Sequence, residues 1–115
     1  MSLKERALET ITNEKRREIL RLLEKGDKSF SEIQSALKMD KGSLTYHMKE
    51  LVHAGLAANI YERRASASSS SSSNARFYSF YKLTSFGAYV TDWYKAFNEK
   101  GAKDRKVIEV ATAER

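Results

Sequence analysis

Two short segments with helical periodicity, separated by a tight break, constrain the fold more than any other feature of this chain. The first can begin at Ser29 or Ser31, and its inward residues recur at helical spacing: Ile33, Ala36 and Leu37. Met39 and Asp40 interrupt this segment after barely two turns, and Asp40 can cap the helix that follows. Two helices joined by so short a turn predict a helix-turn-helix.

The second helix of this pair is predicted over residues 41–54. One face carries the residues that we expect to turn inward: Leu44, His47, Met48, Leu51 and Val52. Gly55 ends the pattern, because glycine tolerates the left-handed conformation that is common at helix ends.

Two further helices are predicted before this pair. The first ten or so residues carry an apolar stripe at helical spacing, formed by Leu3, Ala7, Leu8 and Ile11. This stripe needs an apolar partner, which need not be in the same chain. Residues 13–25 predict the next helix, which Thr12 or Asn13 can cap and Gly26 ends.

After Gly55 the hydrophobic period changes from that of a helix to that of a strand. Residues 56–61 and 77–83 alternate between inward and outward positions, which predicts two strands of a hairpin. Between them, residues 68–73 are six consecutive serines. Such a tract is too polar and uniform to fix a conformation, so we expect residues 66–74 to form a flexible tip.

A last helix is expected to begin at Thr84 or Ser85 and to end near Gly101. It carries aromatic and apolar residues at three- and four-residue steps: Phe86, Tyr89, Val90, Trp93, Tyr94 and Phe97. The tail over residues 101–115 fits either a frayed helix or a docked segment. A chain of 115 residues suits one domain, which we place at residues 1–100.

This order of helices and strands is the winged-helix arrangement, in which the helix after the turn enters the major groove of DNA. Residues 43–56 (SLTYHMKELVHAGL) resemble the recognition helix and first strand of ArsR-type and related MarR-type regulators. Residues 13–23, 30–33 and 77–84, with Gly87 three residues further on, are similar to other parts of that family. The resemblance implies a winged-helix core over residues 12–84 and a dimerisation helix over residues 85–100.

The geometry of the recognition helix selects candidate DNA contacts. If Leu44, Met48 and Leu51 face the core, the outward residues and those at the helix start are Lys41, Gly42, Ser43, Thr45, Tyr46 and Lys49. Their hydroxyls and ammonium groups can reach bases or phosphates. In the expected wing, residues 61–78, folding of the hairpin brings three arginines to one end as a possible clamp on the flanking backbone or minor groove: Arg63, Arg64 and Arg76.

Other charged residues on the helices suit structural roles better. Arg16, Arg17 and Arg21 alternate with glutamates, a pattern typical of ion pairs on a helix surface. A lone histidine such as His47, on the inward side of its helix, is more often a hydrogen-bonded packing residue than a metal ligand. The cysteine pairs and histidine sets of metal-sensing members of the resembled family are missing, so we expect no metal and no cofactor.

The aromatic stripe of the last helix is wider than so small a domain can cover. The resemblance implies that it packs, with the first helix, against a second subunit to form a homodimer. The expected dimer interface is Leu3, Leu8, Ile11, Phe86, Tyr89, Val90, Trp93, Tyr94 and Phe97.

Composition narrows the function further. The net charge of +6 and the sequence pI of about 9.6 favour a polyanionic partner. There is no cysteine for a disulfide or a thiol nucleophile, and no membrane-length apolar run, so we expect a cytoplasmic protein that is not an enzyme. The sequence predicts a DNA-binding transcription regulator, specifically a repressor on a pseudo-palindromic operator. A winged-helix module for protein partners and an architectural DNA-binding protein without sequence preference are the alternatives.

Overall fold

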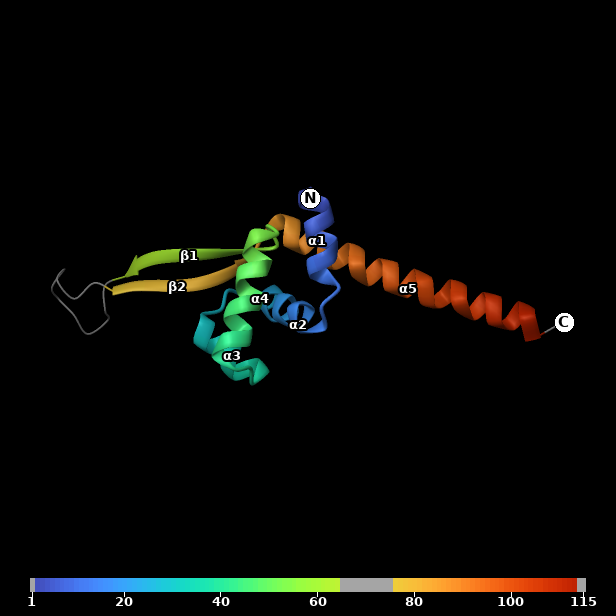
Figure 1. Cartoon of the computed structure of the whole chain (residues 1–115), viewed down its shortest axis with the longest axis horizontal. Coiled ribbons are helices and arrows are strands. Elements are labelled where there is room, and N and C mark those ends of the chain that lie inside the picture. The colour runs from blue at the N-terminus through green and yellow to red at the C-terminus, as the bar shows by residue number, and fades with distance from the viewer. Residues whose placement is uncertain (1, 65–75, 114–115) are drawn as a thin grey trace.

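The computed structural model describes residues 2–64 and 76–113, and within them the side chains of residues 2–61 and 79–101. The described chain is mainly helical with one antiparallel β-hairpin (Figure 1), as the sequence predicts. In chain order the elements are α1 (Leu3–Ile11), α2 (Glu14–Glu24), α3 (Phe30–Leu37), α4 (Lys41–His53), β1 (Ala57–Arg64), β2 (Arg76–Leu83) and α5 (Ser85–Ala113). The expected tip at residues 66–74 falls among residues outside the described ranges.

Short polar side chains begin four of the helices. Ser2, Asn13, Ser29 and Asp40 each accept a hydrogen bond from the backbone N–H three residues further on. Ser29 forms a reciprocal capping box, because the carboxylate of Glu32 in turn accepts from the Ser29 N–H. These caps satisfy N–H groups that have no partner inside the helix. The caps of α2, α3 and α4 are among the residues that the sequence predicts, whereas Ser2 was not predicted as the cap of α1.

The break between α3 and α4 is formed by a left-handed residue. Lys38 ends α3 at φ 52°, and Asp40 is already extended as the cap of α4. At the other end of α4, Gly55 has φ 76°, a conformation that glycine adopts without steric cost. Both ends of the recognition helix are thus fixed by local chemistry.

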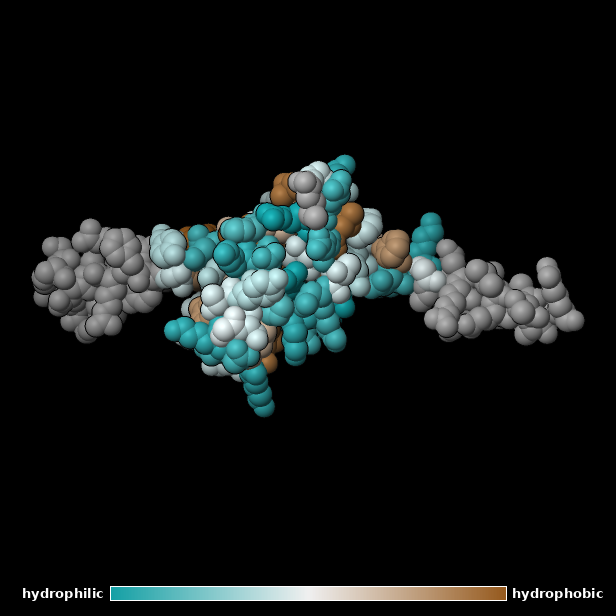
Figure 2. All heavy atoms as spheres, in the orientation of Figure 1, coloured by the Kyte–Doolittle hydropathy of each residue, from teal (hydrophilic) through white to brown (hydrophobic). Residues whose placement is uncertain are grey.

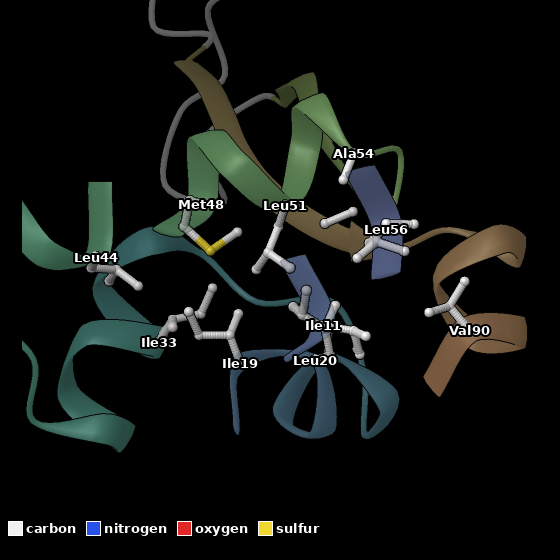
Figure 3. Packing of buried hydrophobic residues seen from close by; sticks show 13 residues of the cluster. Ile11, Ile19, Leu20, Ile33, Leu44, Met48, Leu51, Ala54, Leu56 and Val90 are labelled. Carbon is white, nitrogen blue, oxygen red and sulfur yellow. The ribbon is translucent and has the colours of Figure 1, made fainter. Parts of the chain in front are cut away.

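All five helices contribute to one hydrophobic core (Figure 3). Leu44, Met48 and Leu51 face it from α4, as the sequence predicts, and none of them is more than 2% exposed. The other buried members are Ala7, Ile11, Ile19, Leu20, Leu23, Ile33, Ala54, Leu56, Ala57 and Val90. Helix α1 therefore packs partly inside its own chain.

The hairpin leaves this helical body on the side opposite to α5 (Figure 1). Its strands pair in register from Ala57 opposite Leu83 to Arg64 opposite Arg76. An isolated bridge joins a third segment to β2, with Lys28 N–H donating to the Tyr81 carbonyl and Tyr81 N–H donating to the Lys28 carbonyl. The hairpin is thereby attached to the residues that precede α3.

The start of α5 is tightly joined to the end of α4. The Thr84 hydroxyl donates to the Gly55 carbonyl at 2.6 Å and accepts from the Gly87 N–H at 2.8 Å. Thr84 N–H donates to the Leu56 carbonyl. Gly87 packs directly on that peptide, since a Cβ there would lie only 2.9 Å from the carbonyl carbon of Leu56.

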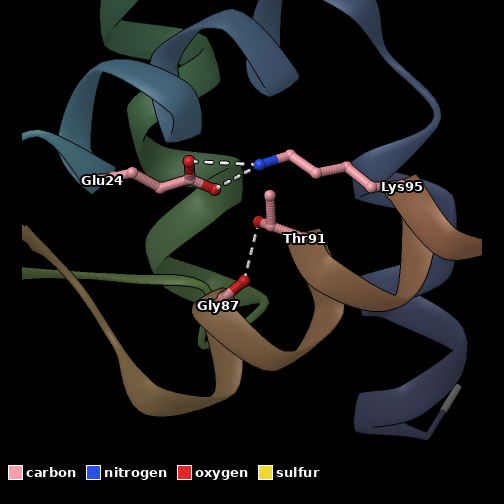
Figure 4. Close-up of polar contacts among 4 residues, drawn as sticks. All are labelled: Glu24, Gly87, Thr91 and Lys95. Carbon is pink, nitrogen blue, oxygen red and sulfur yellow. Dashed lines mark hydrogen bonds and ion pairs between the residues drawn. The ribbon is translucent and has the colours of Figure 1, made fainter.

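Two polar contacts then follow along α5 (Figure 4). The Thr91 hydroxyl donates to the Gly87 carbonyl one turn back. The Lys95 ammonium lies 3.3 Å from the Glu24 carboxylate, which links α5 to the last turn of α2.

The end of α5 differs from the sequence prediction. We expected the helix to stop near Gly101, whereas it continues to Ala113. Glycine inside a helix costs about 1 kcal/mol relative to alanine, which weakens a helix without ending it. The chain has no proline, and among the described residues after Gly101 none is left-handed, so neither feature enforces a stop.

Candidate nucleic-acid interface

The outer face of α4 is the surface that the sequence assigns to DNA. Every candidate on this helix is exposed: Lys41, Gly42, Ser43, Thr45, Tyr46 and Lys49. Tyr46 is the clearest sign of a contact surface, because 56% of this large side chain is exposed on the side away from the core. Figure 2 shows hydrophilic surface over much of the described helical body.

The first turn of α4 is held by its cap. Ser43 N–H donates to the Asp40 carboxylate at 2.9 Å, and the hydrogen bonds from Ser43 lower the pKa of Asp40 below its usual value. The Thr45 hydroxyl donates to the Lys41 carbonyl at 2.7 Å. Its oxygen can therefore accept a hydrogen bond from a ligand, but the hydroxyl can donate to a ligand only if the bond to Lys41 is broken. The first turn therefore offers a fixed backbone beside two hydroxyls and the Lys41 ammonium.

A groove of about 480 Å³ separates α4 from the hairpin. Lys41, Thr45 and Lys49 line its helical wall. Its hairpin wall includes three polar residues that the sequence analysis did not select: Asn59, Tyr61 and Ser79. The strand register could have revealed them, because Asn59 and Tyr61 are two residues apart and Ser79 is the partner of Tyr61.

These three side chains form a hydrogen-bonded chain. Ser79 Oγ donates to Asn59 Oδ1 at 2.9 Å, and Asn59 Nδ2 donates to the Tyr61 hydroxyl at 3.1 Å. Tyr61 is 68% exposed. The hairpin thus presents an ordered polar surface beside α4.

The arginines expected in the wing lie at the far ends of the strands. In the register, Arg64 is opposite Arg76, and Arg63 is opposite Phe77. The backbone thus brings the three positions to the same end of the hairpin, while their side chains lie outside those described.

The opposite flank of α4 meets α2. Arg16 Nε donates to His47 Nδ1 at 3.1 Å, and the Arg16 guanidinium carbon lies 5.5 Å from the centre of the Tyr46 ring. Burial, and then the positive charge of Arg16, lower the pKa of His47 below its ordinary value. His47 is thus a half-buried packing residue with a hydrogen bond, as predicted.

The ion pairing predicted for the α2 arginines is wrong, because among the described residues none of the three pairs with a glutamate. Arg16 binds His47, and Arg17 donates to the Ile11 carbonyl at 2.9 Å while its guanidinium stacks 4.7 Å from the Tyr94 ring centre. Glu24 binds Lys95 on α5. Long basic side chains at these positions reach neighbouring helices, which spacing along one helix cannot show.

The residues assigned to a dimer interface divide into three groups. Leu3, Leu8, Tyr89, Trp93 and Phe97 are exposed, by 55%, 43%, 68%, 41% and 61%. Phe86 and Tyr94 are half-buried. Ile11 and Val90 are only 1% and 5% exposed, because their own chain already covers them, so they are not on the surface that a partner could reach.

The exposed apolar residues gather around α1 and α5. Figure 2 shows brown, hydrophobic residues at the surface beside these helices. A cavity of about 250 Å³ between them is lined mainly by apolar side chains: Ala7, Leu8, Phe86, Tyr89, Val90 and Trp93, with Lys4 at its edge.

Two further features of the described residues concern metal ions and membranes. Among the described side chains, those of residues 2–61 and 79–101, no three metal-ligating groups come together. Within residues 2–64 and 76–113, no helix is both long and apolar enough to cross a bilayer.

The helices, the hairpin and their order define a winged helix-turn-helix protein. Residues 13–58, which run from the cap of α2 into β1, match the family model described as bacterial regulatory protein, arsR family. The resemblance to ArsR-type regulators is thereby confirmed over this segment. Its members are transcription regulators. Among curated proteins, none matches the chain significantly.

Solved structures show the same fold. Mycobacterium tuberculosis Rv0081 superposes with a TM-score of 0.65 at 21% identity, over 90% of this chain and 92% of that one. A homodimeric winged helix-turn-helix DNA-binding domain from Mycobacterium bovis, described as a possible ArsR-family regulator, gives 0.64 at 17% identity, over 89% and 83%.

A longer protein is also similar. The adhesin competence repressor from Streptococcus pyogenes gives a TM-score of 0.56 at 16% identity, over 84% of this chain and 64% of that one. The chain therefore spans less than two thirds of the length of this repressor.

Proposed function

We propose that this protein is a homodimeric transcription regulator that binds double-stranded DNA and represses from a pseudo-palindromic operator. The observation that carries the proposal is the outer face of α4, where six candidate contacts are exposed on the segment that matches the family. The positive net charge and the ordered groove beside the hairpin support the same surface. Two of the similar proteins are named repressors, which supports that direction of regulation.

In this proposal α4 lies in the major groove. Tyr46 and Lys49 reach base edges, since both project from the side opposite the core. Lys41, Ser43 and Gly42 approach phosphates at the start of the helix. The wing arginines Arg63, Arg64 and Arg76 contact the flanking backbone or minor groove.

The second subunit covers the apolar surface around α1 and α5. Five large side chains with 41–68% exposure are more than a monomer leaves to water without reason. A two-fold axis through this surface uses the same residues on both subunits. We therefore place Leu3, Leu8, Tyr89, Trp93 and Phe97 in the interface, with Phe86 and Tyr94 behind them.

This two-fold axis also predicts the operator. Two copies of α4 related by it address successive turns of the major groove, so the half-sites lie about 10 base pairs apart. The unit that performs this function is the winged-helix domain over residues 1–100. Residues 101–115 extend beyond it.

The proposal is tested by fluorescence anisotropy with DNA from upstream of the protein's own gene and with duplexes selected from a random pool. Measurements at two salt concentrations report how many phosphates are neutralised. We expect a specific site, bound at least a thousandfold more tightly than unrelated DNA. Uniform affinity for all duplexes would instead indicate an architectural protein.

A triple variant separates DNA binding from protein recruitment. Lys41→Ala, Thr45→Ala and Lys49→Ala together remove groups only from the outer side of α4, so DNA binding is lost while the dimer remains. The matched control replaces the same residue types elsewhere, at Thr12, Lys25 and Lys100, all of them exposed. Equal DNA binding by both triple variants would contradict the proposed interface and favour a module for protein partners.

A further inference from the structure

Arg16 lies outside the helix-turn-helix yet reaches the exposed side of the recognition helix. It belongs to the first turn of α2, and its backbone N–H donates to the cap residue Asn13 at 3.1 Å. Its side chain crosses to α4, where Nε donates to His47 Nδ1. The guanidinium carbon is then 5.5 Å from the ring centre of Tyr46.

The position of this guanidinium is defined by three contacts. Asn13 fixes the backbone, His47 fixes the direction of Nε, and the Tyr46 ring supports the planar group from one face. His47 can accept this bond only as the neutral imidazole that carries its proton on Nε2. The adjacent rings of Tyr46 and His47, 5.7 Å apart, belong to the same cluster.

The same guanidinium keeps donors for a ligand. An arginine side chain has five N–H donors, of which Nε carries one. In the described part of the chain, Nε is the atom of this side chain that is hydrogen-bonded, and the terminal nitrogens Nη1 and Nη2 carry the other four. They lie beside Tyr46, which is 56% exposed on the outer side of α4.

We propose that Arg16 is a further DNA-contacting residue, which binds a backbone phosphate through Nη1 and Nη2 while His47 and Tyr46 hold its guanidinium in place. The inference rests on the proposed DNA-binding function, and it assigns a contact to a helix that the helix-turn-helix does not include. A planar guanidinium suits this role, because it can donate two parallel hydrogen bonds to a phosphate while stacked on a ring. A lysine ammonium cannot make both contacts.

The dependence of affinity on salt distinguishes this role from a purely structural one. Each phosphate contact contributes about 0.9 to the slope of log affinity against log salt concentration. Removing Arg16 from both subunits should therefore reduce the slope by about 2. Loss of packing alone would weaken binding without changing the slope.

The experiment compares Arg16→Ala, Arg16→Gln and Arg16→Lys on a duplex that the wild-type protein binds, at four or more salt concentrations. Arg16→Ala should lose roughly tenfold or more in affinity, as expected for a charged hydrogen bond, together with about 2 in slope. Arg16→Gln retains much of the aliphatic stem and should show the same loss of slope, even if the alanine variant folds poorly. Arg16→Lys should retain the slope and lose affinity.

Arg21→Ala is the matched control, because this arginine is on the same helix, is exposed and lines the opposite, α5 side of α2. It should leave the slope unchanged. An unchanged slope in Arg16→Ala and Arg16→Gln, or an equal decrease in Arg21→Ala, would overturn the inference while leaving the proposed function intact. Failure of the wild-type protein to bind any DNA would overturn both.

Discussion

Gly87 allows a severe test of how α5 is joined to the winged helix. An added Cβ at this position would lie 2.8 Å from Leu83 Cδ1 and 2.9 Å from the carbonyl carbon of Leu56. The Leu56 atoms are backbone, so no change of rotamer can move them away. The start of α5 would have to shift, and that shift would disturb the bonds of Thr84 to both neighbouring segments.

The expected change in the free energy of unfolding of Gly87→Ala has two opposing contributions. Overpacking against an immovable neighbour costs about 3 kcal/mol, at the upper end of the usual range. Replacing a helical glycine with alanine returns about 1 kcal/mol. Gly87→Ala should therefore destabilise the protein by about 2 kcal/mol and lower the melting temperature by roughly 8 °C.

Gly101→Ala is the matched control in the same helix. A Cβ at this position meets no atom within 4 Å, so only the gain in helix stability remains, about 0.5–1 kcal/mol. Urea unfolding followed by circular dichroism, at one fixed protein concentration, measures both variants. If Gly87→Ala is as stable as the wild type, the close packing of α5 on Leu56 is not a feature of the folded protein.

Three other predictions concern the dimer, a titration and a cap. Trp93→Ala should weaken dimerisation by about 2 kcal/mol, near thirtyfold, in light scattering over a dilution series, whereas Lys100→Ala should not. Since the folded pKa of His47 is lowered from 6.5, the folded protein binds fewer protons than the unfolded chain below that pH. Stability should therefore fall from about pH 6.5 down through the folded pKa, and His47→Gln should abolish this dependence. Asp40→Ala removes the cap of α4 and should lower the urea midpoint, whereas the exposed Asp27→Ala should leave it unchanged; equal midpoints would contradict the role of the cap.

The sequence predicts those parts of the fold that depend on local chemistry. Asn13 and Asp40 cap helices because their side chains bind N–H groups three residues away, and such short-range signals can be read from the chain. Leu44 and Met48 face the core because helical spacing places them on one side. The outer face of α4 could be inferred from the same periodicity.

The sequence could not predict contacts that depend on the packing angle between helices. Charge alternation along α2 indicated ion pairs, yet Arg17 stacks on Tyr94 across the helix interface. Ile11 belongs by spacing to the apolar stripe assigned to the dimer interface, but it is buried with Ala7 inside its own chain, while Leu3 and Leu8 stay exposed. Gly101 was predicted to end the last helix, but α5 continues past it. A glycine can end a helix, and the sequence alone does not show whether it does.

The junction at Thr84 has a mechanical consequence. Its hydroxyl holds the peptide that ends α4, and its backbone N–H holds the peptide that begins the hairpin. Because these hydrogen bonds join the first turn of α5 to both segments, a tilt of that turn would move α4 and the hairpin together. In the proposed dimer, such a tilt would change the distance between the two copies of α4 while leaving each winged helix undistorted.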